Sequence, residues 1–320
     1  MGSWLVDELL GRGHSVISVD DLSGGYMRNV NKDCTFIKGD LRDTALVNRV
    51  VSDVDIIYHL AAYAAEGQSV FSPIEINDIN IKSMNNLLVA AINRSVKRFV
   101  FTSSMAVYGR QKAPFSEEMP RLPEDPYGAG KAYCENMLEI FQAAYGMDYT
   151  IIRPHNVYGP RQNIADPFRN VLGIWINRLM SGKAPILYGT GKQVRAFSYI
   201  EESNLAIANA GFRDGARNQI INVGSPEHVT INDACSMVLE LMASEQRPEY
   251  SPGRLLEVEV AYSTTGKSEE LLDYRHLHTL EDGLREMIDW AKQVGPQEPS
   301  YRLPLEITKS APKVWADKLI

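Results

Sequence analysis

Short apolar segments alternate with helical patterns through the first half of the chain, and this alternation most restricts the possible fold. Runs rich in Val, Ile, Phe and Tyr indicate β-strands at 15–20, 34–38, 54–60, 98–102 and 149–153. Stretches with helical periodicity lie between them, at 4–10, 45–51, 79–93 and 127–145. Strands of this kind, joined by helices, predict a parallel sheet covered on both faces, which is the doubly wound α/β architecture.

The pattern loosens after Pro154, where glycine, proline and polar turns become frequent. Helices are expected near 170–180, 231–244 and 280–294. We therefore predict a Rossmann-type nucleotide-binding domain over residues 1–155. A smaller, loop-rich α/β substrate-binding domain is expected over residues 156–320, with some segments crossing between the two.

The start of the chain departs from this fold. A doubly wound nucleotide-binding domain normally opens with a strand, a glycine-rich turn and a helix. Here Met1-Gly2-Ser3-Trp4 leads directly into a helical pattern, and Gly2 resembles the last glycine of a G-x-x-G-x-x-G fingerprint. The usual first strand and two glycines are thus expected to be absent. Either Met1 is an internal methionine of a longer protein, or the chain is short and binds a cofactor's pyrophosphate weakly.

An acidic residue ends the strand expected at 15–20. Asp20 is positioned to accept hydrogen bonds from the adenosine ribose hydroxyls of NAD, although a turn-forming role is the alternative. The following residues, Asp21 to Ser23, supply no cation for a 2′-phosphate. NAD is therefore favoured over NADP.

Composition and charge limit the remaining function classes. The net charge of −7, without any Lys/Arg run, argues against a nucleic-acid partner. Cys34, Cys134 and Cys235 lack metal-binding spacing, so no metal is expected and a reduced compartment fits. No stretch reaches the ~18 apolar residues of a membrane span, and no secretory signal is visible, so the expected location is the cytoplasm.

Candidate catalytic groups lie at the start of the helix expected at 127–145. Tyr127 and Lys131 are four residues apart and share one helix face, where a lysine cation would favour the phenolate of a tyrosine. Ser104 follows the strand at 98–102, at the sheet edge where ligands bind in such folds. The Tyr–Lys pair alone is more often an ordinary surface pair, but Ser104 at this spacing makes an acid–base site for a sugar hydroxyl more specific.

The combination resembles the extended short-chain dehydrogenase/reductase family, in particular its UDP-glucose 4-epimerase branch. The resemblance implies a catalytic trio of Ser104, Tyr127 and Lys131. Matching segments imply further cofactor contacts at Gly2, Asp20, Asp21, Asp40, Leu41, Leu60, Ala61, Ala62, Asn80, Tyr127, Lys131 and Pro154. They imply substrate contacts at Ser104, Asn156, Arg161, Arg195, Arg254, Glu257 and Ala261. In that family the arginines hold the nucleotide-sugar diphosphate, and a guanidinium suits it because it bonds two oxygens at once.

By this resemblance, the expected activity is inversion of C4 of a UDP-hexose by transient oxidation with bound NAD. Ala261 would leave room for a 2-acetamido group, which predicts tolerance of UDP-N-acetylhexosamines. Ser104-Met105-Ala106 lacks the acidic residue of the family's dehydratases and decarboxylases. Two alternatives stay open: another nucleotide-sugar enzyme such as a UDP-uronate 4-epimerase, and a non-catalytic nucleotide-binding protein. The resemblance also implies a homodimer formed through 79–93 and 127–145.

The histidines are not expected to act in chemistry. His59 lies in an apolar strand and is predicted to be a core residue. His155 neighbours Asn156, so a ligand contact is possible but not favoured. His276 and His278 are expected in surface turns.

Overall fold

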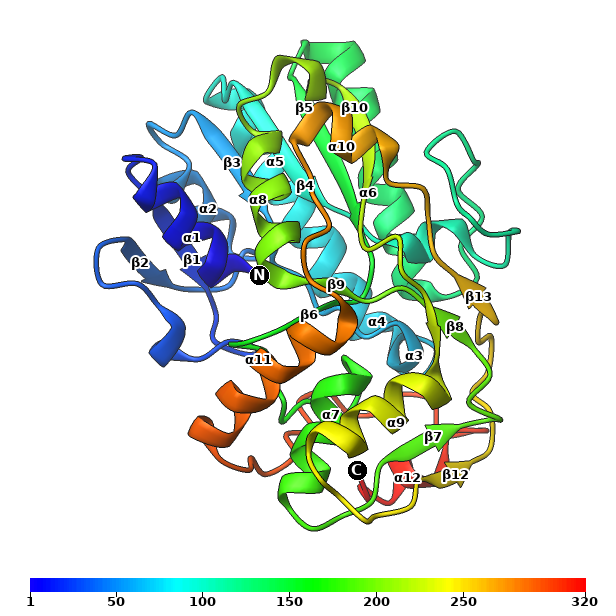
Figure 1. Ribbon diagram of the computed structural model, residues 1–320. Helices are drawn as coiled ribbons and strands as arrows, with labels where there is room; N and C mark the ends of the chain where they lie inside the picture. The colour runs from blue at the N-terminus through cyan, green and yellow to red at the C-terminus, as the bar shows by residue number, and fades with distance from the viewer.

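A parallel sheet of four strands forms the centre of the larger lobe in a computed structural model that describes residues 1–320 (Figure 1). Its strands, in spatial order, are β10 (Gln219–Val223), β5 (Tyr149–Pro154), β4 (Arg98–Thr102) and β3 (Ile56–His59). Strands β1 (Ile17–Asp20) and β2 (Thr35–Lys38) pair in parallel only with each other. The strands are parallel, as predicted, but they form two sheets and not one continuous sheet.

Helices cover both faces of the four-stranded sheet because alternate strand residues point to opposite sides. Phe99 and Phe101 of β4 pack with one set of helices, and Val100 packs with the other. The first set is α2 (Thr44–Val50), α5 (Ser83–Asn93) and α6 (Pro126–Tyr145). The second set is α1 (Gly2–Gly11), α8 (Ile200–Ala210) and α10 (Gly266–Leu272). This is the doubly wound arrangement expected from the sequence.

Segments from the second half of the chain complete this lobe. β10 lies beside β5, with Ile220 opposite Ile151, and α8 and α10 pack on the same face of the sheet as α1. Several segments that follow residue 155 therefore belong to the larger lobe, so the chain crosses between the two lobes more than once.

The smaller lobe is built on three amphipathic helices and short strands. Helices α7 (Val171–Met180), α9 (Ile231–Leu241) and α11 (Leu280–Val294) enclose a core that includes Trp175 and Leu187. Helix α11 begins at a capping box, in which Thr279 and Asp282 satisfy each other's backbone N–H groups. The short strands are β6 (Val157–Tyr158), β7 (Ile186–Tyr188), β8 (Val194–Arg195), β9 (Ser198–Tyr199), β11 (Val229–Thr230), β12 (Glu249–Ser251) and β13 (Val260–Ala261).

Short helices connect the longer elements, and the C-terminal tail packs against segments from both halves of the chain. These helices are α3 (Glu66–Ser69), α4 (Pro73–Asn77), α12 (Lys313–Ala316), the 3-10 turns η1 (Met27–Asn29), η3 (Met105–Tyr108) and η4 (Asp214–Ala216), and the π turn η2 (Asp78–Lys82). Trp315 of α12 is buried in edge-to-face contact with Phe71 and Phe168. The tail is thereby fixed to residues that precede α4 and α7.

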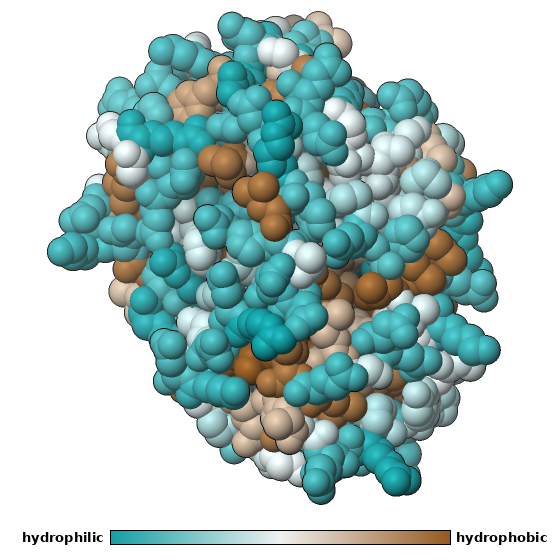
Figure 2. Space-filling view, in the orientation of Figure 1, coloured by the Kyte–Doolittle hydropathy of each residue, from teal (hydrophilic) through white to brown (hydrophobic).

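The face of the molecule shown in Figure 2 is mostly hydrophilic, with apolar side chains gathered in small separate patches. None of the helices combines the length and the apolar character needed to cross a membrane.

Candidate functional site

Ser104 stands at the carboxyl end of β4, where the chain turns into η3. Its hydroxyl oxygen accepts a hydrogen bond from the Ala106 N–H at 3.1 Å and so caps this short helix. All five residues of β4 are buried, so the strand end is fixed by the sheet. The sequence expectation that Ser104 lies at the ligand-binding edge of the sheet agrees with this geometry.

Helix α6 brings Tyr127 and Lys131 to the same edge. The helix begins at Asp125, whose carboxylate accepts from the Gly128 N–H at 2.9 Å, and Pro126 occupies its first turn. The Tyr127 N–H donates to the Ser69 hydroxyl at 3.1 Å. Both Tyr127 and Lys131 are buried, as expected for residues on one inward helix face.

Gly128 allows α6 to approach η3 closely. A Cβ atom on this glycine would lie 2.7 Å from the backbone oxygen of Ala106, closer than such atoms can come. Any larger residue would therefore separate the helix that carries Tyr127 from the turn that carries Ser104.

Lys131 is directed at the backbone of β4. Its ammonium donates to the Thr102 carbonyl at 2.7 Å and lies 5.8 Å from the centre of the Tyr127 ring. Burial lowers the pKa of Lys131 to about 8, which leaves most of its charge at neutral pH.

The pKa of the Tyr127 phenol differs from the expectation. Burial raises the pKa of Tyr127 above its usual value, while an interaction with the Ser104 hydroxyl opposes the rise. Lys131 was expected to favour the phenolate, but burial dominates the pKa of Tyr127, and the positive charge that opposes it is that of Arg169. Tyr127 is thus a neutral acid here, and it needs further positive charge in the cleft before it can act as a base.

An ionic network beneath these residues was not anticipated from the sequence. Glu135, one turn after Lys131 on α6, accepts from Arg153 of β5 at 2.6 and 2.9 Å, from Arg121 at 2.6 Å and from Ser103 at 2.5 Å. Burial opposes its ionisation, but the hydrogen bonds and charge of Arg153 leave the pKa of Glu135 below its usual value. The network joins α6 to β4 and β5 and so fixes the height of Tyr127 along the sheet edge.

Two predicted arginines converge on one carboxylate in the smaller lobe. Arg254 makes a bidentate pair with Glu257 at 2.6 and 2.9 Å, and Arg195 lies 3.5 Å from the same carboxylate. Ala261 is buried opposite Arg195 in the β13–β8 pairing. These four predicted residues are thus brought together, and the two guanidinium groups form a cationic site suited to a diphosphate.

Asn156 and Arg161 have different surroundings. Asn156 has a positive φ of 30°, and its amide donates to the Ala196 carbonyl at 2.8 Å. Arg161 pairs with Asp7 of α1 at 2.5 Å and stacks on Trp4. Arg161 therefore joins the lobes on the α1 side and is not part of the Arg195–Arg254 group.

Several predicted cofactor residues lie at the carboxyl ends of β1, β3 and β5. Asp20 ends β1 and Asp21 follows it, and their carboxylates accept from the N–H groups of Leu22 and Ser23, both at 2.7 Å. Leu60, Ala61 and Ala62 follow β3, and Pro154 ends β5.

The remaining predicted cofactor residues lie in the turns around that edge. Asp40 is held by Arg42, which keeps the pKa of its carboxyl below its usual value, and Leu41 accepts from Asn86 at 2.9 Å. Asn80 is buried and bonded to both backbone groups of Tyr63. Gly2 begins α1 in open space, since a Cβ there would meet no atom within 4 Å. An open helix start and an acidic residue at the next strand end suit the diphosphate and ribose of NAD, so these residues fit that cofactor.

A pair of acidic residues beside Tyr127 was also missed. Glu66 begins α3, and Asp125 caps α6; Ser69 donates to the Glu66 carbonyl at 2.6 Å and to the Asp125 carboxylate at 3.2 Å. Burial, then the charge of Glu66, raises the pKa of Asp125 to about 7. Burial likewise raises the pKa of Glu66, which the charges of Arg195 and Arg254 oppose. Glu66 is therefore near both the catalytic tyrosine and the substrate arginines.

The histidines lie outside this site. His59 is buried against Phe99 and Phe101, as predicted. His155 is fully buried, and burial lowers its pKa to about 4. His276 and His278 are only partly exposed, because both rings face the buried carboxylate of Glu202. Both lie in the irregular segment between α10 and α11, as expected, but their contacts with Glu202 were not predicted.

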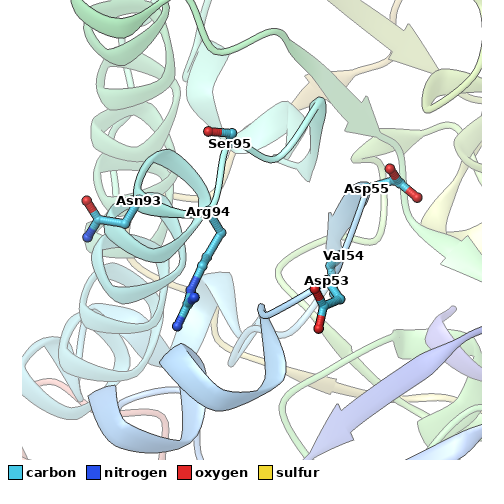
Figure 3. A pocket seen from close by; sticks show the side chains of 6 residues that line it. All are labelled: Asp53, Val54, Asp55, Asn93, Arg94 and Ser95. Carbon is cyan, nitrogen blue, oxygen red and sulfur yellow. The ribbon is translucent and has the colours of Figure 1, made fainter.

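A polar hollow at the opposite edge of the sheet is separate from these groups. Figure 3 shows that it is lined by the segment before β3 (Asp53, Val54 and Asp55) and the end of α5 (Asn93, Arg94 and Ser95). Because β3 starts here, the hollow lies at the amino end of the strands, away from Ser104 and Tyr127.

Comparisons with known proteins identify relatives of this chain. The model of the NAD dependent epimerase/dehydratase family matches residues 1–224. A UDP-glucose 4-epimerase of Mycolicibacterium smegmatis is 31% identical over 91% of this chain and 95% of its own length. The UDP-N-acetylglucosamine 4-epimerase of Methanobrevibacter ruminantium M1 is 33% identical, with a TM-score of 0.84 over 90% of this chain and 94% of its own. A UDP-glucuronic acid 4-epimerase of Bacillus cereus, solved with UDP-glucuronic acid and NAD, is 25% identical, with a TM-score of 0.85 over 92% of this chain and 96% of its own.

Proposed function

The chain belongs to the NAD dependent epimerase/dehydratase family, and from this membership we propose that it inverts C4 of a UDP-hexose. The observation that carries the proposal is the meeting of Ser104 with Tyr127 and Lys131 at the carboxyl edge of the sheet. The arginine pair around Glu257 supports it, because a nucleotide diphosphate needs such a partner.

In the proposed reaction the Tyr127 oxygen takes the proton of the sugar 4-hydroxyl, and the Ser104 hydroxyl orients that group and relays the proton. Bound NAD supplies the reversible acceptor for the hydride of C4. Lys131 holds a positive charge 5.8 Å from the centre of the phenol ring. The hydrogen bond with Ser104 and the charge of Arg169 oppose the rise that burial imposes on the pKa of Tyr127. Return of the hydride to the opposite face of the sugar then requires the 4-keto sugar to turn over within the cleft.

Arg195 and Arg254 hold the diphosphate while the sugar turns. Their present partner Glu257 accepts from Arg254, and this pairing preorganises the guanidinium group before the substrate arrives. By the family resemblance, Glu257 bonds the uridine ribose and Asn156 contacts the diphosphate. The nucleotide thus stays anchored through both hydride transfers.

The acidic pair Glu66 and Asp125 favours an uncharged hexose over a hexuronate. Both carboxylates raise the pKa of Tyr127, which means that their charge is felt where the sugar reacts. A substrate carboxylate at C6 would add like charge in a partly desolvated cleft. Ala261 is small and belongs to the same buried cluster as Met105, which supports acceptance of the 2-acetamido sugars.

A homodimer is part of the proposal. Val89 of α5 and Ile140 of α6 are 50% and 57% exposed, and Asn85 and Tyr133 link the two helices at 3.3 Å. Apolar side chains on two adjoining helices are suited to a second copy of the same surface.

Product assays test the function directly. The purified protein is incubated separately with UDP-glucose, UDP-N-acetylglucosamine and UDP-glucuronate, and the C4 epimers are separated by ion-pair chromatography. We expect conversion of the first two and loss of about 10²–10⁴-fold in rate for Tyr127→Phe and Ser104→Ala. Absence of any epimer from all three substrates would reject the proposal, and so would full activity of Tyr127→Phe.

A further inference from the structure

Two guanidinium groups meet over the loop that follows β1. A Cβ atom built on Gly24 would lie 2.8 Å from Nη1 of Arg302 and 3.7 Å from Nη1 of Arg169. Arg169 precedes α7, and Arg302 belongs to the C-terminal tail, so both reach this loop from outside the Rossmann-type lobe. The loop is held in place from the same side, because Asn163 donates to the Gly24 carbonyl at 3.2 Å and accepts from Tyr26 at 2.7 Å.

The two positive charges have no acidic partner at contact distance. Every ion pair within 4.0 Å in the chain involves other cations, and no side-chain hydrogen bond involves either arginine. Both residues are partly buried. Two like charges held close together in a partly desolvated place repel each other, and an anion between them would remove that repulsion.

Arg169 and Arg302 lie close to residues that are expected to contact the cofactor. Arg302 lies 5.1 Å from the Tyr63 ring centre, and its charge opposes the rise that burial causes in the pKa of Asp20. The charge of Arg169 reaches the Tyr127 phenol. The pair therefore lies between Asp20, the expected partner of the adenosine ribose, and Tyr127, the expected neighbour of the nicotinamide.

The start of α1 faces the same place. The charges of Arg169 and Asp20 are both felt at Met1, the residue that precedes α1. The first N–H groups of α1 lack partners within the helix and favour an anion. A dinucleotide that extends from Asp20 to Tyr127 carries its two phosphates midway along its length, where α1, Arg169 and Arg302 meet.

We propose that Arg169 and Arg302 bind the diphosphate of the dinucleotide cofactor, so that the smaller lobe and the C-terminal tail supply cations to a site otherwise formed by the first helix. This inference rests on the proposed function, since it assumes that NAD lies along the strand ends. It assigns the cofactor's phosphates to arginines distinct from Arg195 and Arg254, which serve the substrate.

Calorimetric titration of the full chain, freed of co-purified nucleotide, tests the assignment. The ligands are NAD, ADP, adenosine and UDP, and the variants are Arg169→Met, Arg302→Met and the double substitution. Each single variant should weaken NAD and ADP by about tenfold or more, the usual range for a charge-assisted bond to phosphate. Adenosine and UDP should bind as they do to the wild type. Arg302→Lys should restore part of the lost affinity.

Arg285→Met is the matched control, because Arg285 is exposed on α11 and pairs only with Glu281. Unfolding temperatures of all variants check that the fold is intact. Unchanged affinity for NAD and ADP in both single variants would overturn the inference, as would a wild type that binds neither ligand. A loss of UDP binding without loss of ADP binding would also overturn it, because the arginines would then serve the substrate.

The outcomes separate this site from the proposed function. A protein that binds NAD through Arg169 and Arg302 but turns over no UDP-sugar keeps the site and loses the function. A protein that epimerises its substrate while both variants bind NAD normally keeps the function and loses the site.

Discussion

Glu66 and Asp125 show how single residues set the electrostatics of the cleft. Neither forms an ion pair, and both act on Tyr127 through charge. Around them, Lys131 and the arginine pair supply the opposite sign. We therefore expect these two carboxylates to influence both the choice of sugar and the dependence of stability on pH.

Replacing Glu66 with Gln removes one negative charge at almost constant volume. The ratio of kcat/KM for UDP-glucuronate to that for UDP-glucose should rise by about tenfold, since relief of a like-charge contact in the cleft is worth about 1.4 kcal/mol. Glu270→Gln, an exposed change on α10, is the control and should leave the ratio unchanged. An unaltered ratio in Glu66→Gln would show that its charge does not reach the sugar.

Asp125→Asn should change how stability depends on pH. Burial, then Glu66, raises the pKa of Asp125 to about 7, so the folded protein holds this proton more tightly than the unfolded chain does. The contribution of Asp125 to stability is therefore fully present at low pH and falls as the pH rises from about 4 to about 7. Asparagine keeps the helix cap but has no proton to lose.

Thermal unfolding at pH about 5 and about 7.5 checks this expectation. The Asn variant should gain stability relative to the wild type at the higher pH. An equal difference between the two proteins at both pH values would contradict it.

At the scale of elements, the site depends on the contact between α6 and η3. Gly128→Ala would set a Cβ 2.7 Å from the Ala106 oxygen and force the helix away from Ser104. We expect a rate loss of about tenfold or more, because misplacement by about 1 Å can cost a hundredfold. Gly266→Ala, at the start of α10 where a Cβ meets no atom within 4 Å, is the control. Equal activity of the two variants would show that this close approach does not matter.

Elements with strong local patterns were predictable from the sequence. β4 was expected at 98–102 and spans Arg98–Thr102, because every residue in it is buried and apolar or paired. α11 has the predicted bounds, since Thr279 and Asp282 mark its start. β10 and α8 were not predicted, because they follow glycine-rich and polar turns. Their place in the larger lobe depends on contacts with residues far away in the sequence, such as the pairing of β10 with β5.

The residues of the site likewise include some that the sequence predicts and some that it does not. Tyr127, Lys131 and Ser104 carry a recognisable spacing, and the structure brings them to one edge. Glu135 and Arg153 lie in different elements, and nothing local in the sequence shows that they pair. The pKa of Tyr127 was misjudged because a helix spacing reveals the neighbouring charge but not the depth of burial.

At the scale of the whole molecule, the exposed apolar residues of α5 and α6 predict assembly. Ile140→Glu should convert the proposed dimer into a monomer, because the substitution buries a charge at the helix interface. Light scattering after size-exclusion chromatography measures the mass. Leu277→Glu, at a site that is 75% exposed and outside these helices, is the control and should leave the mass unchanged. A wild type that is monomeric at micromolar concentrations would contradict the proposed interface.

The proposed reaction requires that the substrate stay bound between the lobes while the hydride leaves C4 and returns to the same carbon. UDP-glucose labelled with deuterium at C4 tests this directly when the product is examined by NMR. We predict UDP-galactose that keeps deuterium at C4, formed by the wild type and not by Tyr127→Phe. Failure to form the epimer, or an epimer whose C4 deuterium has been exchanged for solvent hydrogen, would contradict the mechanism.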